Sequence, residues 1–233
     1  LFNLEQQYDF SKLSSSIKSQ IKKAIKLYFA FLNSDKEKTK KHKKTSQDFR
    51  ILSLFANIGV AEAFLEKSGF DVAVANELIP SRAKLYSRIY PHTKMICGDI
   101  TKDEIYNKII STSISKNVNV VMATPPCQGM STVGKLDKND IRNTLIYDVI
   151  KAIKTIKPSY GFIENVPSFL STSIFVNDEV VSIDKLIERE LGQYYIIHQY
   201  IANCKNYSVP QTRERTIVLL TARGKNIKEW ILP

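Results

Sequence analysis

Short apolar runs rich in β-forming residues alternate with helical patterns from Asp48 to the end of the chain, and this alternation limits the possible folds most strongly. The candidate strands are Arg50–Phe55, Asp71–Asn76, Thr93–Ile96, Asn119–Met122, Tyr160–Ile163, Tyr195–Tyr200 and Thr216–Leu220. Helical patterns lie between them, near Ala61–Ser68, Pro80–Ile89, Asp103–Ile110, Asn143–Ile156 and Ile183–Leu191. Alternating strands and helices indicate βαβ units, and continuously apolar strands indicate a sheet covered on both faces. The sequence therefore predicts a doubly wound α/β fold with a mostly parallel, seven-stranded sheet.

Residues 1–48 differ from the rest of the chain because they are polar, basic and free of glycine and proline. Apolar side chains recur there at three- and four-residue spacing, which predicts an amphipathic helix with Ser11 as its N-cap. These apolar positions are Leu13, Ile17, Ile21, Ile25, Tyr28 and Leu32. The lysine-rich run 36–44 is interpreted as a solvated linker, with contact to phosphate as the alternative. We expect a helical extension and basic linker over residues 1–48, and a larger domain over residues 49–233.

The charge balance favours a polyanionic partner. The chain has 34 Lys and Arg against 23 Asp and Glu, a net charge of +11, and nucleic acid is the simplest partner of that kind. The alternative is that richness in lysine and isoleucine reflects an AT-rich genome. No apolar run approaches the roughly 20 residues that span a bilayer, and no leader-like stretch begins the chain, so neither membrane insertion nor secretion is expected.

The three cysteines favour a reducing compartment. Cys97, Cys127 and Cys204 are widely spaced and form no Cys-x-x-Cys pair. A disulfide framework and a zinc site are therefore not expected, and no metal is predicted.

Ligands of such sheets bind outside the carboxyl ends of the strands, so the residues that follow each strand are candidates for binding. The first strand ends in the turn 55–60, in which Gly59 lets backbone amides approach a ligand, although an ordinary βα turn explains it equally well. One glycine where a dinucleotide fingerprint has three argues against an NAD site. Glu77 ends the second strand and is placed to accept ribose hydroxyls, as a surface glutamate would also be. Asp99 and Ile100 follow the third strand and suit an adenine ring, but Asp99 is equally a helix N-cap candidate.

The fourth and fifth strands end in residues suited to nucleophilic catalysis. Cys127 follows Pro125 and Pro126, which stiffen the backbone, so its thiol is a candidate nucleophile, with an inert buried cysteine as the alternative. Glu164 follows the next strand, and sequential parallel strands usually neighbour one another. The sequence therefore predicts a nucleophile and a general acid that face one ligand, with a helix-start role for Glu164 as the alternative.

Two arginines precede the last strand. Arg213 and Arg215 alternate with Glu214, so in an extended segment both point to one side. Guanidinium groups suit phosphate and base oxygens, whereas a solvated edge strand is the other interpretation.

Together these motifs resemble the cytosine-5 DNA methyltransferases, over residues 50 to 222. The resemblance rests on seven pieces in the family's order. They are the Phe55–Gly59 turn, Glu77, Gly98-Asp99-Ile100, Pro125-Pro126-Cys127-Gln128, Asp140-Ile141-Arg142-Asn143-Thr144-Leu145, Glu164-Asn165-Val166 and Gln211-Thr212-Arg213-Glu214-Arg215. The resemblance implies the AdoMet-dependent methyltransferase fold, S-adenosyl-L-methionine as methyl donor, no metal, and the cytoplasm of a bacterium with a restriction-modification system.

The resemblance also implies roles for the site residues. Cys127 would be the nucleophile, Glu164 would act on ring nitrogen 3 of cytosine, Arg215 would hold its carbonyl oxygen, and Arg213 would support a loop or a phosphate. Phe55 and Leu78 would flank the adenine, Glu77 would take the ribose hydroxyls, Asp99 and Ile100 would read the adenine, and Leu145 would lie near the methionine end. Asn57, Ile58, Gly59 and Pro125 complete the implied cofactor site. The segment 129–139 would close over a cytosine rotated out of double-stranded DNA.

Two departures from the family pattern have consequences. Asn57 and Val60 stand where the glycine-rich turn usually has glycine, so we expect a lowered cofactor affinity. The target recognition domain and final helix of the family are missing before Pro233, which implies a truncated enzyme or one subunit of a split enzyme whose second chain carries target recognition. A tRNA cytosine-5 methyltransferase and a catalytically silent nucleic-acid-binding module of the same fold are the alternatives.

Overall fold

The computed structural model describes residues 49–126, 145–176, 179–207 and 209–232. The chain divides into two units after Ser46, and all of these residues belong to the second. The predicted helix over 11–32, the lysine-rich run, Cys127 and the predicted loop 129–139 lie outside the described residues.

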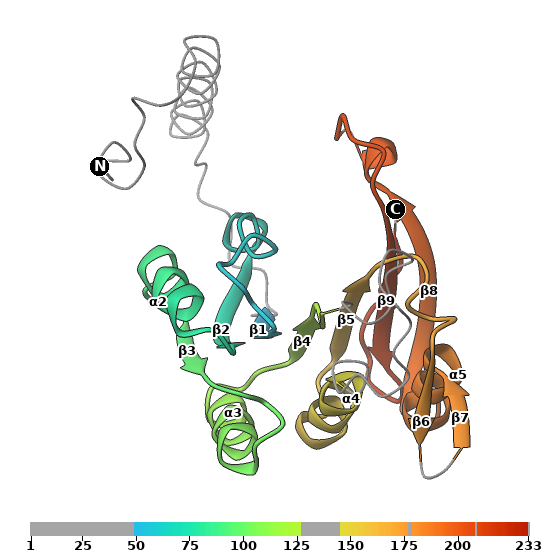
Figure 1. Ribbon diagram of the computed structural model, residues 1–233, viewed down its shortest axis with the longest axis horizontal. Helices are drawn as coiled ribbons and strands as arrows, with labels where there is room; N and C mark the ends of the chain where they lie inside the picture. Colours follow the sequence, from blue (N-terminus) through green and yellow to red (C-terminus); the bar gives the residue numbers. More distant parts are fainter. Residues whose placement is uncertain (1–48, 127–144, 177–178, 208, 233) are drawn as a thin grey trace. The chain divides into compact units, whose positions relative to one another are not determined.

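Seven strands form one sheet in the order β3-β2-β1-β4-β5-β9-β8, which Figure 1 shows from left to right. They are β1 (Phe49–Leu54), β2 (Phe70–Glu77), β3 (Lys94–Cys97), β4 (Val120–Ala123), β5 (Tyr160–Asn165), β8 (Tyr195–Asn203) and β9 (Glu214–Ala222). The pairs from β3 to β5 are parallel, whereas β9 is antiparallel to both β5 and β8. Every predicted strand is confirmed, as is the mostly parallel sheet.

Helices cover both faces of the sheet, which confirms the doubly wound arrangement. They are α2 (Pro80–Ile89), α3 (Asp103–Ser115), α4 (Leu145–Ile156) and α5 (Ile183–Leu191). Side chains of α3, α4 and α5, such as Ile109, Ile153 and Leu186, form one buried cluster with alternate residues of the strands. On the opposite face, Tyr86 of α2 packs with Ala56 and Ala75 in a separate cluster. Proline at the start of α2 suits the first turn of a helix, where its missing N–H is not needed.

The predicted helix over Ala61–Ser68 is wrong. This segment consists of turns and a short 3-10 helix, η4 (Glu66–Ser68). Helices in proteins are stabilised mainly by packing of an apolar face, but Val60 and Phe64 are exposed here. The buried side chain of the segment is Glu62, which accepts a hydrogen bond from Ser53 Oγ at 2.6 Å. The segment is therefore fixed by a polar contact to β1 rather than by an apolar stripe.

A small hairpin was not predicted. It pairs β6 (Ser173–Val176) with β7 (Glu179–Ser182) and leads directly into α5. A further short 3-10 helix, η6 (Cys204–Tyr207), follows β8.

The last described residues cross the sheet face opposite α3, α4 and α5. The Trp230 ring lies 5.6 Å from the Tyr160 ring and 6.2 Å from the Phe162 ring. Its backbone N–H donates to Thr221 Oγ1 at 2.9 Å, and Tyr160 Oη donates to the Lys228 carbonyl at 2.8 Å. This segment covers the part of the face next to the candidate site.

Candidate active site

The register of the sheet brings the carboxyl ends of its strands to one edge. Leu54 of β1 pairs with Asn76 of β2 and with Ala123 of β4, and Ala123 pairs in turn with Ile163 of β5. The residues that follow Leu54, Asn76, Ala123 and Ile163 therefore lie along the same edge of the sheet. This edge carries most of the site residues predicted from the sequence.

The turn after β1 has an unusual backbone. Phe55 (φ 59°), Asn57 (φ 50°) and Gly59 (φ 88°) all lie in the left-handed region. Hydrogen bonds hold it in place, from Ala56 N to the Asn76 carbonyl and from Gly59 N to the Ala56 carbonyl, each 2.9 Å long. Asparagine adopts positive φ more readily than most residues, so Asn57 serves where the family pattern has glycine. Ile58 lies within this turn.

Glu77 ties the turn to the end of β2. The residue is 5% exposed, and its Oε2 accepts the Asn57 N–H while Oε1 accepts the Ile79 N–H, both at 2.9 Å. Arg82 lies 3.9 Å from Oε1. Because a carboxylate has about four acceptor positions, Glu77 keeps the capacity to bind two further donors. These free acceptor positions fit a ligand that presents neighbouring hydroxyl groups.

The end of β3 lies beside Glu77, since Gly98 N donates to the Glu77 carbonyl at 3.0 Å. Asp99 Oδ1 accepts from the Thr101 N–H and hydroxyl, so Asp99 does cap the following turn. Ile100 is 4% exposed and belongs to the core cluster, whereas Leu78 is 61% exposed. Contact of either side chain with an adenine ring stays a prediction.

The other predicted cofactor residues lie nearby in the fold. Leu145 is the first residue of α4 and packs against the core. Pro125 follows β4 directly. Sequence reasoning missed Asn76, whose buried amide donates to the carbonyls of Ile96 and Gly98 and fixes β2 to the end of β3. A polar residue within an apolar strand, just before Glu77, was the available signal.

The backbone that leads to Cys127 is anchored on both sides. Thr124 Oγ1 donates to the Phe55 carbonyl at 3.2 Å, and Asn165 Nδ2 donates to the Pro125 carbonyl at 3.0 Å. Asn165 follows Glu164 in β5 and is 4% exposed. The described backbone therefore ends, at Pro126, close to the tip of β5. Whether the thiol of Cys127 faces Glu164 stays a prediction.

Glu164 forms an ion pair with Arg215. The distance from Arg215 Nε to Glu164 Oε1 is 2.9 Å, and the two side chains are 21% and 29% exposed respectively. Arg215 Nη1 also donates to the Glu214 carbonyl at 2.6 Å. Ionic hydrogen bonds of this length fix the orientation of both groups, so the carboxylate has a defined direction.

A groove of about 650 Å³ joins the two halves of the site. Phe55 and Asn57 of the turn, Thr124, Glu164 and Arg213 all line it. Trp230 forms part of its wall. The structure thus brings the predicted cofactor turn and the predicted catalytic carboxylate to one cavity.

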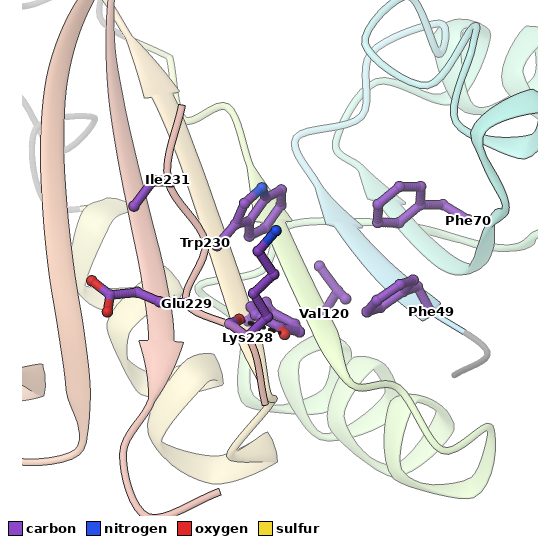
Figure 2. Close-up of a pocket in the computed structure, with 8 residues that line it drawn as sticks. Phe49, Phe70, Val120, Lys228, Glu229, Trp230 and Ile231 are labelled. Carbon is purple, nitrogen blue, oxygen red and sulfur yellow. Dashed lines mark hydrogen bonds between the residues drawn. The ribbon is translucent and has the colours of Figure 1, made fainter. Parts of the chain in front are cut away.

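A second cavity of about 300 Å³ lies on the same face. Figure 2 shows Phe49 and Phe70 on one side of it and Trp230 with Lys228 on the other. Phe49 and Val120 begin their strands, so this cavity lies toward the amino ends of the strands. None of the residues predicted for the site lines it.

The sequence analysis also did not identify two buried ionisable groups, Glu62 and Tyr86. Glu62 is 2% exposed, and burial raises the pKa of its carboxyl group. Burial also raises the pKa of Tyr86, in α2. Glu62 contacts Ser53 of β1, Tyr86 packs with Ala56 of the turn, and neither residue lines the groove.

Among residues 49–126, 145–176, 179–207 and 209–232, no cluster of histidine, cysteine, aspartate and glutamate is arranged to hold a metal ion. No helix within the described part of the chain is long and apolar enough to cross a bilayer.

Comparisons with known proteins agree with this geometry. Type II methyltransferase M1.HgaI of Avibacterium volantium is 43% identical over 187 residues, which cover 78% of this chain and 52% of that protein. Type II methyltransferase M.AquIA of a Picosynechococcus strain is 27% identical over 186 residues, which cover 77% of this chain and 74% of that protein.

Solved structures share the fold. A DNMT2 variant from Spodoptera frugiperda superposes with a TM-score of 0.58 at 22% identity, over 77% of this chain and 51% of that one. The chain thus spans about half the length of M1.HgaI and of this structure. The model of the C-5 cytosine-specific DNA methylases matches residues 49–232, and the chain belongs to that family.

Proposed function

We propose that this chain is the catalytic part of a DNA cytosine-5 methyltransferase, which transfers a methyl group from S-adenosyl-L-methionine to carbon 5 of cytosine. Residues 49–233 would be the catalytic domain, and residues 1–48 an extension. The observation that supports this most is the Glu164–Arg215 ion pair at 2.9 Å, in a groove shared with the turn after β1. A carboxylate held in that way, beside the anchored backbone that precedes a cysteine, suits a reaction on a pyrimidine ring.

The methyl donor would lie along the edge formed by β1, β2 and β3. Bound there, S-adenosyl-L-methionine would supply a methyl group made electrophilic by its sulfonium centre. Glu77 would accept the ribose hydroxyls through its remaining acceptor positions, and Asp99 would accept from the adenine amino group. Phe55, Leu78, Ile100, Pro125 and Leu145 would make the apolar contacts, and the turn at Asn57, Ile58 and Gly59 would approach the ligand with its backbone.

Cys127, Glu164 and Arg215 would each act on a different part of the cytosine ring. The Cys127 thiolate would add to carbon 6, forming a carbon–sulfur bond and pushing electron density toward carbon 5. Glu164 would donate a proton or hydrogen bond at nitrogen 3, which stabilises that density and is typically worth about 10²–10⁴ in rate. Carbon 5 would take the methyl group, leaving S-adenosyl-L-homocysteine, and would then lose its proton to a base. The sulfur would leave carbon 6 as the proton at nitrogen 3 returns to Glu164. Arg215 would orient Glu164 and face the carbonyl oxygen of the base.

The substrate would be double-stranded DNA with the target cytosine rotated out, at a cost of a few kcal/mol. The net charge of +11 suits the phosphate backbone. Target recognition would come from the part of the methyltransferase that lies outside the match, either in one polypeptide or as a second chain in the bacterial cytoplasm.

Covalent trapping tests this proposal. Duplex DNA with 5-fluorocytosine at its cytosines would be incubated with S-adenosyl-L-methionine and the protein, alone and with the unmatched half of M1.HgaI supplied separately. Because fluorine blocks loss of the carbon 5 proton, we expect an adduct that survives denaturing electrophoresis and maps to Cys127 by mass spectrometry. Cys127→Ser should abolish it.

Two matched controls use the other cysteines. Cys97→Ser and Cys204→Ser should leave the adduct intact, since neither side chain lines the groove. No adduct in either setting, or an adduct that persists in Cys127→Ser, would contradict the proposal. An adduct with 5-fluorocytosine RNA alone would instead support a tRNA substrate.

A further inference from the structure

The turn that would approach the methyl donor needs support from outside itself. Phe55 and Asn57, neither of them glycine, have positive φ, and such conformations are strained unless the surroundings impose them. Val60 stands where the family pattern has a further glycine and is 74% exposed. The contacts that hold the turn therefore decide how well its amides are arranged.

Tyr90, at the end of α2, makes a close contact with the turn. Its hydroxyl donates to the Gly59 carbonyl at 2.5 Å, across 31 positions of sequence. Its ring also lies against the Gly59 backbone, because a Cβ added at Gly59 would come within 2.1 Å of Tyr90 Cε2. The close approach requires both glycine at position 59 and an aromatic ring at position 90.

The ring of Tyr90 is itself fixed. It lies 4.8 Å from the ring of Tyr86, which is fully buried and packs under Ala56 of the turn. Glu77 holds the Asn57 N–H at one side of the turn, and Tyr90 holds the Gly59 carbonyl at the other. Both come from the same strand-and-helix unit, β2 and α2, so the two contacts form one clamp.

We propose that Tyr90 is a positioning residue for S-adenosyl-L-methionine binding, which acts by holding the Gly59 carbonyl and so the direction of the turn's amides. This inference rests on the proposed function for the identity of the ligand. Tyr90 does not touch the reacting atoms, so its effect falls on donor affinity.

Tyr90→Phe keeps the ring and removes the hydroxyl. We expect the Kd for S-adenosyl-L-methionine, measured by equilibrium dialysis with labelled donor on the full chain, to rise about 3- to 10-fold. Tyr160→Phe and Tyr195→Phe are matched controls, since their hydroxyls also donate to backbone carbonyls, of Lys228 at 2.8 Å and Pro158 at 3.1 Å. Neither carbonyl belongs to the turn, and both controls should bind donor as the wild type does.

Amide hydrogen exchange on the ligand-free chain gives an independent measurement. Tyr90→Phe should speed exchange in the peptide 55–61 at least about threefold, whereas the two controls should not change it. Unchanged exchange and unchanged Kd in Tyr90→Phe, or equal effects in all three variants, would overturn the positioning role. If the wild type binds no donor but exchange responds to Tyr90→Phe alone, the proposed function fails while the clamp on the turn stands.

Discussion

Glu62 is a buried carboxyl group in the segment that follows the cofactor turn. It is 2% exposed, and its Oε1 accepts from Ser53 Oγ at 2.6 Å. Burial raises its pKa, and the hydrogen bond from Ser53 opposes that shift without cancelling it. The folded chain therefore binds the Glu62 proton more tightly than the unfolded chain does.

This difference predicts a pH-dependent stability. A group whose pKa rises on folding stabilises the fold fully below its unfolded pKa, about 4.3, and loses that contribution as pH rises through the folded value. We expect the free energy of unfolding of the wild type, relative to Glu62→Gln, to decline across that window and then level off. Urea denaturation at several pH values, followed by circular dichroism, measures it. Glu66→Gln, on the exposed side of the same segment, should track the wild type, and a flat difference for Glu62→Gln would contradict the prediction.

Residues of the site were partly predictable because strand ends are visible in sequence. Glu77 and Glu164 follow apolar runs, so their place at the carboxyl edge could be predicted from the parallel order alone. Tyr90 could not be predicted, because its contact with Gly59 depends on how α2 packs over the turn. Burial of Glu62, within the predicted helix 61–68, could not be predicted either, because nothing local indicates that its side chain turns inward.

Helices and strands likewise divide into those that local sequence predicts and those that depend on tertiary contacts. The strands of the large sheet can be recognised from local sequence, since each is a short run rich in β-branched and aromatic residues. All seven were predicted. The hairpin of β6 and β7 has strands of four residues with Phe175 and Val180 exposed, so it lacks that signal. The segment 61–68 carries helical spacing but buries no apolar side chain fully, with Leu65 only partly buried, and spacing alone does not make a helix.

The junction between β4 and β5 carries a prediction about catalysis. Asn165 Nδ2 donates to the Pro125 carbonyl at 3.0 Å, and its Oδ1 accepts the Val166 N–H at 2.8 Å. Asn165→Asp keeps the acceptor but removes the donor, so the backbone before Cys127 loses its anchor. We expect a loss of about 1–3 kcal/mol in stability and adduct formation slowed about 10- to 100-fold.

The trapping assay with 5-fluorocytosine DNA measures the rate. Asn203→Asp is the control, because Asn203 Nδ2 also donates a side-chain hydrogen bond, to Glu214 Oε1 at 3.3 Å, but this bond is exposed to solvent. An unchanged trapping rate in Asn165→Asp would show that this anchor does not position the cysteine.

The two faces of the sheet are covered unequally in the described part of the molecule. One face packs against α3, α4 and α5, whereas the other has α2 over β2 and β3 and the segment around Trp230 over β5. Trp230 borders both cavities of this face. Trp230→Ala should lower the free energy of unfolding by about 2 kcal/mol, less than the roughly 3–5 kcal/mol of a fully buried aromatic. Urea denaturation followed by circular dichroism measures it, and Ile231→Ala, 56% exposed, should cost under about 0.5 kcal/mol.

The net charge of +11 gives a prediction about DNA binding that separates the two arginines of the site. Arg213 is exposed at the groove, whereas Arg215 is neutralised by Glu164 at 2.9 Å. A cation that contacts phosphate releases counterions, so its removal flattens the dependence of affinity on salt. Arg213→Gln should lower the slope of log K against log salt by about 1, and Arg215→Gln should leave it nearly unchanged. Fluorescence anisotropy with duplex DNA measures both slopes. Salt would be varied from about 50 to 200 mM, over which the affinity of a phosphate-contacting protein falls steeply. Equal slopes for Arg213→Gln and the wild type would assign Arg213 to loop support rather than to phosphate.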